Sequence, residues 1–150
     1  MSSVKHTEVF EVDLPIEHTF PLFSPEGEKA WVPGWDYENV MATTQLCEDY
    51  VFLTQTHDHA TADAVWIVKR YEPEKYLVEF YKIEPADKLG VVVVKCRDLG
   101  SDKAEVCITY KYIALSERGE RFIATFTKDV YADFIGKWKS LLLRYTEGRG

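Results

Sequence analysis

The C-terminal stretch SERGERFIATFTKDVYADFIGKWKSLLLRYTEG, residues 116–148, decides the fold that we predict for this chain. At about 100° per residue its apolar side chains fall on one broad arc, which is typical of a helix and not of a strand. Ser116 is a suitable N-cap and Gly148 a suitable stop, so the stretch predicts one helix about 45 Å long. The arc consists of Phe122, Ile123, Phe126, Val130, Tyr131, Phe134, Ile135, Trp138, Leu141, Leu142 and Tyr145.

An arc with this many aromatic rings needs a wide apolar surface to cover it, and the rest of the chain predicts such a surface. A first strand at residues 4–14 is expected to turn Phe10, Val12 and Leu14 inward. Six further segments are rich in Val, Ile, Thr and aromatic residues, and short turn-forming clusters separate them. Short turns predict antiparallel hairpins in a meander and exclude parallel sheets, which need crossover helices. The six segments are residues 36–44, 50–56, 64–72, 76–84, 90–98 and 105–115.

Two short helices are expected between the first and second strands. Pro15 suits the first turn of one, and Ser24 with Pro25 caps and opens the other. The predicted order is therefore one strand, two short helices, six strands and one long helix, in a single domain that spans residues 1–150. This is an α+β fold, with a curved seven-stranded antiparallel sheet around a long C-terminal helix.

Charge and composition narrow the possible functions. The formal net charge of −7 argues against a nucleic-acid partner, because phosphates need a contiguous basic surface. Aromatic residues make up 14% of the chain, so some rings are expected to line a cavity. Three cysteines without a CxxC pair, and the absence of an export leader, indicate a cytoplasmic protein with buried free thiols. No apolar run is long enough to span a membrane.

The order of elements, with SPEGEKAWVPGW at residues 24–35, WIV at 66–68 and YIALS at 112–116, resembles bacterial members of the START-like, or polyketide cyclase-like, helix-grip superfamily. The resemblance covers nearly the whole chain. It implies a cavity between the sheet and the helix, where members bind lipids, sterols, polyketides, quinones or plant hormones. It thus implies binding or transport of a small hydrophobic molecule, without a cofactor, by a monomer or homodimer. A cyclase- or dehydratase-type enzyme and a chaperone-activator-like interaction module are the alternatives.

Candidate ligand-binding residues are aromatic or polar side chains that are expected to point into this cavity. For each ring, plain core packing stays open, because burial stabilises by about 2–3 kcal/mol against protein or ligand alike. Thr127 falls near the centre of the helical arc, where its hydroxyl needs a partner, either the Ile123 carbonyl or a ligand. The candidates are Trp35, Phe52, His57, Trp66, Tyr81, Tyr110, Phe122, Phe126, Thr127, Val130 and Phe134.

Two polar groups suggest chemistry, and each has an alternative. If Lys82 faces solvent, Glu79 enters the concave side of the sheet and is a weak candidate for acid–base catalysis, although Phe80 favours the opposite orientation. The His57-Asp58-His59 group contains zinc-binding residue types but lacks further ligands at useful spacing, so we expect a polar turn and no metal. His57 is then expected at the cavity mouth.

Two further features stay open between two interpretations. Trp31 and Trp35 flank a rigid Pro-Gly turn, which suggests either a lid over the cavity or a contact surface for a partner. Cys96 and Cys107 lie in consecutive predicted strands, where they either pack separately or face each other across a hairpin.

Overall fold

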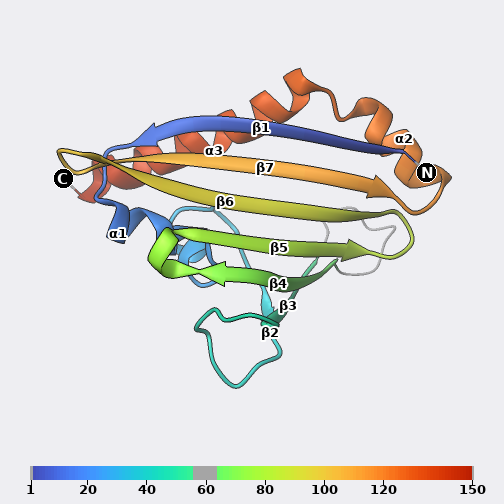
Figure 1. Cartoon of the computed structure of the whole chain (residues 1–150), viewed down its shortest axis with the longest axis horizontal. Helices are drawn as coiled ribbons and strands as arrows, with labels where there is room; N and C mark the ends of the chain where they lie inside the picture. Colours follow the sequence, from blue (N-terminus) through green and yellow to red (C-terminus); the bar gives the residue numbers. More distant parts are fainter. Residues whose placement is uncertain (1, 56–63, 150) are drawn as a thin grey trace.

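The computed structural model describes residues 2–55 and 64–149 and has one seven-stranded antiparallel sheet, in the order β1-β7-β6-β5-β4-β3-β2 (Figure 1). Strands β2 to β7 follow one another across the sheet, as the short turns predict, and β1 pairs with β7 at the far edge. The predicted meander is therefore confirmed. The strands are β1 Ser3–Val12, β2 Glu38–Asn39, β3 Val51–Thr54, β4 Ala64–Glu72, β5 Leu77–Glu84, β6 Lys88–Gly100 and β7 Lys103–Ala114.

The predicted strand at residues 36–44 is much shorter in the structure, where β2 contains two residues. Asn39 explains the early end, because its side chain bonds to the backbone that follows. Its Oδ1 accepts a hydrogen bond from the backbone N–H of Met41 at 3.1 Å, and its Nδ2 donates to the Thr43 carbonyl at 3.1 Å. Such local bonds compete with a sheet ladder, so the chain turns away from the sheet after Asn39.

Short helices lie between β1 and β2, as predicted. Ser24 Oγ accepts a hydrogen bond from the Gly27 N–H at 2.9 Å, which fixes the start of the short helix at residues 27–30. A side chain at Gly27 would not fit, because a Cβ there would lie only 2.0 Å from the Pro21 carbonyl oxygen. These helices are α1 Ile16–Thr19, η1 Phe20–Phe23 and η2 Gly27–Ala30, and a further short helix, η3 Pro73–Lys75, joins β4 to β5.

The C-terminal stretch forms two helices, so the prediction of one unbroken helix is wrong. Helix α2 spans Glu117–Thr125 and helix α3 spans Lys128–Arg149. Ser116 caps α2 as expected, with its Oγ accepting from the Gly119 N–H at 3.3 Å. Thr127 Oγ1 accepts from the Val130 N–H at 3.2 Å, which is the bond that an N-cap makes. Hydrophobic periodicity places Thr127 in the middle of one helix, but in the structure it begins a second helix.

The two C-terminal helices cover only part of the sheet. Helix α3 packs mainly against β1 and α2 mainly against β7, and Figure 1 shows α3 running behind these outer strands. Tyr131 of α3 is fully buried and donates a 2.6 Å hydrogen bond to the carbonyl of Ile108 in β7. The inner, helix-facing side of β1 carries Phe10 and Val12, as predicted. The inner faces of β3, β4 and β5 lie farther from the two helices.

The cysteines are free in the structure, but they are not all buried. Cys47 is exposed, which corrects the expectation of three buried thiols. Cys96 is buried on the inner face, and burial raises its pKa to about 12. Cys107 pairs with Lys95 in the β6–β7 ladder and so lies on the outer face. Because side chains of adjacent residues alternate between faces, Cys96 and Cys107 do not face each other.

Candidate functional site

The β5–β6 hairpin turns charged side chains toward the inside of the sheet. In the ladder Lys82 pairs with Gly90, and Glu84 pairs with Lys88. All four share the inner face with buried Phe80 of β5, because they follow one another at intervals of two along each strand. The Lys88 and Glu84 side chains are 9% and 10% exposed, and Lys88 Nζ lies 3.0 Å from Glu84 Oε2. That oxygen lacks a well-aligned hydrogen bond, so charge attraction dominates this pair.

Aromatic rings lie beside both lysines. Lys88 Nζ lies 4.0 Å from the ring centroid of Phe122 in α2 and 5.5 Å from that of Tyr112 in β7. Lys82 Nζ lies 5.4 Å from the ring of Trp66 in β4. Cation–π attraction stabilises an ammonium in such places, and more strongly where water is excluded. Burial nevertheless lowers the pKa of Lys82.

Trp66 belongs to a wall of rings on the inner face of β3, β4 and β5. Phe52 and Trp66 are cross-strand neighbours with stacked rings, and their centroids are 5.5 Å apart. Phe80 meets Trp66 edge-on at 5.9 Å. The Trp66 indole N–H donates to Thr54 Oγ1 at 2.9 Å, which fixes the orientation of the ring.

A carboxyl group of the short helices acts electrostatically on the inner face of β7. Glu28 of η2 keeps some exposed surface, but the surrounding protein desolvates it and raises its pKa to about 8. Its charge acts on Tyr110 of β7, whose pKa is raised first by burial and then by neighbouring groups that include Glu28. Tyr110 in turn contacts Tyr112, Phe134 and the ring of Trp138.

Several interior rings keep exposed surface although they pack on the core. The side chains of Trp66, Phe122, Phe134 and Trp138 are each partly buried and contact the buried cluster of the domain. Each also contacts an inner-face ring, such as Phe80 for Trp66 or Tyr110 for Phe134. The inner face therefore combines partly exposed rings with the Lys82 ammonium and the buried Lys88–Glu84 ion pair.

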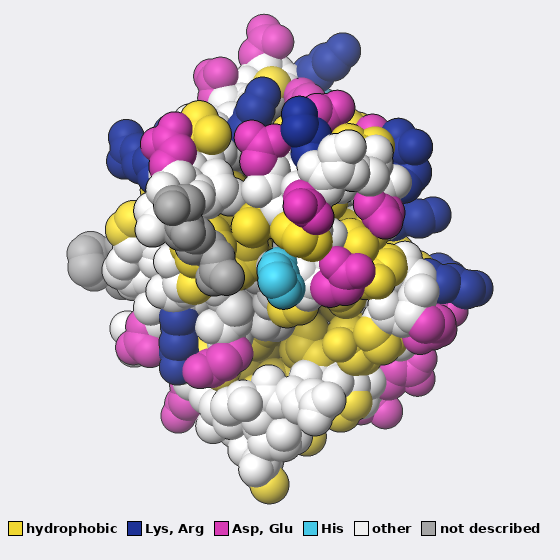
Figure 2. Space-filling model, turned by 90° about the vertical axis from the view of Figure 1, so that its left-hand side faces the viewer, with side chains coloured by type: hydrophobic (Ala, Val, Ile, Leu, Met, Phe, Trp, Pro, Cys, Tyr) yellow, Lys and Arg dark blue, Asp and Glu magenta, His cyan; other side chains and the backbone are white. Residues whose placement is uncertain are grey.

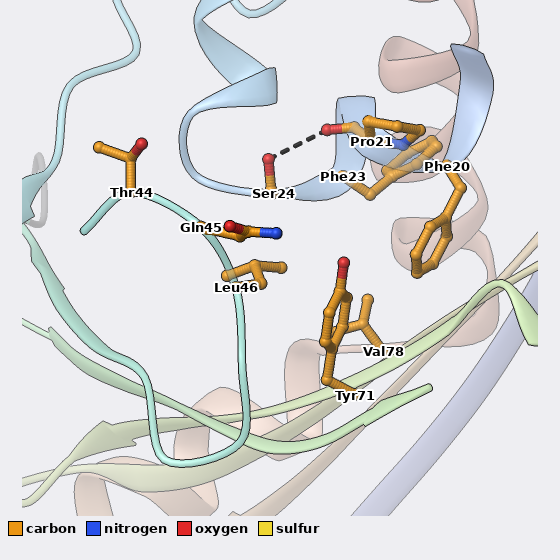
Figure 3. A pocket seen from close by; sticks show the side chains of 9 residues that line it. All are labelled: Phe20, Pro21, Phe23, Ser24, Thr44, Gln45, Leu46, Tyr71 and Val78. Atoms are coloured by element: carbon orange, nitrogen blue, oxygen red, sulfur yellow. Dashed lines mark hydrogen bonds between the residues drawn. The ribbon is translucent and has the colours of Figure 1, made fainter. Parts of the chain in front are cut away.

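A pocket of about 180 Å³ opens on the inner side at the other end of β5 (Figure 3). Residues of η1, residues 44–46, and Tyr71 and Val78 line it. The Tyr71 hydroxyl points into the space between Leu46 and Phe20, and desolvation raises its pKa. Figure 2 views the end of the molecule at which α1 lies, where hydrophobic side chains gather in a hollow across the middle of the face.

A larger but open groove of about 570 Å³ lies on the opposite, outer face of the sheet. Glu79 and Tyr81 line this groove, with Lys69 Nζ 3.6 Å from Glu79 Oε2 and 5.0 Å from the Tyr81 ring. The orientation that would have brought Glu79 to the concave side is therefore wrong, and so is the inward direction expected for Tyr81. Phe80 and Lys82 occupy the inner face instead. The β5–β6 ladder is regular throughout, so side chains alternate without interruption and Lys82 lies on the same face as buried Phe80.

The structure brings most of the other predicted residues together. Phe52, Trp66, Tyr110, Phe122, Phe126 and Phe134 all make inner-face ring contacts. Thr127 is exposed as the α3 cap, and Val130 is 47% exposed, so neither lines the interior.

Residues outside the sheet and the C-terminal helices also differ from expectation. Trp35 is partly buried and donates from its indole N–H to the Pro25 carbonyl at 2.8 Å. Trp31 is 5% exposed, with its indole N–H bonded to the Leu22 carbonyl at 2.8 Å, so it does not present a ring at the surface. His57 lies outside the described residues.

Sequence reasoning missed Glu28, Lys82, Glu84 and Lys88. The sequence leaves the orientation of Lys82 open, because a strand lysine usually faces solvent whereas Phe80 favours the inside. The available signal was the strand itself, because Lys82 and Glu84 stand in the same alternating set as Val78 and Phe80.

The part of the chain that the structure describes, residues 2–55 and 64–149, contains neither a candidate metal site nor a helix that could span a membrane. These residues contain no group of three or more His, Cys, Asp or Glu side chains that could hold a metal ion. None of the helices among them is long and apolar enough to cross a membrane.

No protein-family model matches this sequence, and no curated protein matches it either. Several solved structures do match this chain. Norcoclaurine synthase from Thalictrum flavum, in complex with dopamine and hydroxybenzaldehyde, has a TM-score of 0.69 at 11% identity, over 99% of this chain and 89% of that one. An aromatase/cyclase from Streptomyces sp. R1128 has a TM-score of 0.66 at 13% identity, over 99% and 96%. A major latex-like protein from Panax ginseng has a TM-score of 0.69 at 16% identity, over 98% and 97%. The chain thus has the helix-grip fold of these proteins, with a long C-terminal helix packed on a seven-stranded antiparallel sheet.

Proposed function

We propose that this protein binds a small, largely apolar molecule in the interior between the sheet and helices α2 and α3. The wall of Phe52, Trp66 and Phe80 would hold one side of the molecule. Phe122 and Phe134 would hold the other side. The pocket beside Tyr71, at the opposite end of β5, is the expected route of entry.

The observation that carries this proposal is the remaining exposure of interior rings. Trp66, Phe122, Phe134 and Trp138 are only partly buried, although each one contacts the core. Leaving a large ring exposed forgoes up to about 2–3 kcal/mol of burial energy. A guest molecule that covers several such rings recovers this energy, which is how apolar pockets favour their ligands.

A neutral fluorescent probe tests the proposal and distinguishes binding in the interior from binding in the outer groove. We expect N-phenylnaphthylamine to bind with increased fluorescence, and Trp66→Ala to weaken its binding about tenfold or more, since a buried aromatic contact is worth about 1.5 kcal/mol or more. Val91→Ser, in the floor of the outer groove, should leave the affinity unchanged. The proposal fails if the probe does not bind, or if Val91→Ser weakens binding while Trp66→Ala does not.

The position of Glu28 favours a second candidate function, an acid–base enzyme of the cyclase or dehydratase kind. A carboxyl group with a pKa of about 8 is protonated at neutral pH and can both donate and accept a proton. Its charge acts on the buried phenol of Tyr110, which can hold a substrate oxygen. The enzyme would use the same interior as the binding protein.

The test of this second candidate is turnover of a linear poly-β-ketone, followed by mass spectrometry for cyclised or dehydrated product. Glu28→Gln should abolish product formation, and Glu17→Gln, on the exposed first turn of α1, should not. Product formation that survives Glu28→Gln would remove Glu28 from the mechanism.

A further inference from the structure

The charges on the inner face of the β5–β6 hairpin do not balance. Lys82 and Lys88 bring two ammonium groups, and Glu84 brings one carboxylate, which is paired with Lys88 at 3.0 Å. Asp87, the other buried acid nearby, is 3.0 Å from Arg118 Nε and is already paired. Among the described residues, Lys82 Nζ has no salt-bridge or hydrogen-bond partner. It lies 5.4 Å from the centroid of the Trp66 ring, and the Glu84 carboxylate acts on it only through charge attraction at longer range.

An ammonium in this position is unusual on physical grounds. Lys82 keeps some exposed surface, but the surrounding protein desolvates its ammonium, and removal of an unpaired charge from water is costly. The Trp66 ring at 5.4 Å compensates part of that cost but offers no hydrogen-bond acceptor. Lys82 therefore keeps three N–H donors without an acceptor among the described residues, on the face of the sheet that also carries Trp66 and Phe80.

Gly90, the ladder partner of Lys82, leaves room for the lysine side chain. A Cβ added to Gly90, its ladder partner, would lie 3.3 Å from Lys82 Cβ and 2.9 Å from Tyr112 Cε1. The absence of a side chain at position 90 thus leaves room for the lysine stem and for the tyrosine ring. The ring of Tyr112 in turn contacts Phe122 of α2 at 5.1 Å.

We propose that the interior ligand is an apolar monoanion whose single acidic group, a carboxylate or a group of similar charge, pairs with Lys82. The apolar body then lies against Trp66 and Phe80. One negative charge neutralises the excess of one positive charge on the inner face of the hairpin. A dianion such as a phosphate monoester would instead leave an excess of one negative charge there. This inference rests on the proposed function, because it assigns the chemistry of a ligand in the same interior.

Two probes with the same ring system separate the inference from the proposed function. Anilinonaphthalene sulfonate carries one negative charge, and N-phenylnaphthylamine lacks the sulfonate and is neutral. The native chain should bind the anionic probe about tenfold more tightly than the neutral one, a difference that corresponds to about 1.4 kcal/mol. Lys82→Met should remove this preference and leave the affinity for the neutral probe within about twofold. Lys82→Arg should keep it, since the positive charge is retained.

Lys111→Met is the matched control, because Lys111 lines the outer groove and not the interior. It should change neither affinity. If Lys111→Met abolishes the preference and Lys82→Met does not, the anion binds on the outer face and the inference is overturned. If the neutral probe binds and the native chain shows no preference for the anion, the inference alone is overturned. Binding of neither probe overturns the proposed function together with it.

Discussion

The substitution Glu28→Gln should stabilise the folded chain by an amount that grows with pH. Glu28 has a pKa of about 8 in the folded protein, against an ordinary value of 4.5, because burial disfavours its charged form. The folded state therefore binds more protons than the unfolded state between these two values. By linkage, stability falls as pH rises through this window, and the ionised carboxylate costs most above the upper value.

The magnitude follows from the two pKa values. Each tenfold difference in proton affinity corresponds to about 1.4 kcal/mol, so the full cost of ionised Glu28 is about 4–5 kcal/mol. At about pH 5 only about 1 kcal/mol of that cost is present, and at about pH 8.5 nearly all of it is. Glutamine keeps the shape of the protonated acid and does not ionise, so the variant escapes the cost.

Urea unfolding at these two pH values measures the effect, with the free energy of unfolding compared between the native chain and the variant. The stability gain of Glu28→Gln should rise by about 3–4 kcal/mol between about pH 5 and about pH 8.5. The control, Glu17→Gln on the exposed side of α1, should follow the native chain at both. A gain that stays constant within about 0.5 kcal/mol would mean that Glu28 is solvated, and would refute the interior position assigned to it.

Three further substitutions test the described contacts by urea unfolding. Thr127→Ala removes the cap of α3 and should lower the free energy of unfolding by about 1 kcal/mol, with Thr127→Ser close to native; equal losses for both would contradict the capping role. Tyr131→Phe removes the buried hydrogen bond to the Ile108 carbonyl and should cost about 1–3 kcal/mol; no measurable loss would mean that water satisfies that carbonyl. Gly90→Ala crowds the Lys82 and Tyr112 side chains, so it should lower the free energy of unfolding by about 1–3 kcal/mol and weaken binding of the neutral probe. Gly136→Ala, with open space around it in α3, should raise the free energy of unfolding by about 0.5–1 kcal/mol. The crowding argument fails if both glycine variants behave alike.

The fold was predictable because its two main signals are long and regular. The helical arc and the chain of hairpins each extend over many residues, so local errors do not change the architecture. The errors occur where one side chain satisfies the backbone locally, as at Asn39 after β2 and at Thr127 before α3. Hydrophobic periodicity alone does not register such a cap, because it counts a threonine as one more position on the helix.

The interior site was harder to predict, because β5 changes character halfway along its length. Its first half, Val78 to Phe80, places apolar groups inside and Glu79 outside, as an ordinary two-faced strand does. Its second half reverses this order, with Lys82 and Glu84 inside and Tyr81 on the outer face. A bulge would explain such a reversal, but the β5–β6 register has none. Lys82 and Glu84 therefore face inward against the usual pattern, and their charges carry a desolvation cost. Local rules are most often broken at functional sites, so this reversal favours Lys82 over Glu79 as the β5 group that would meet the proposed ligand.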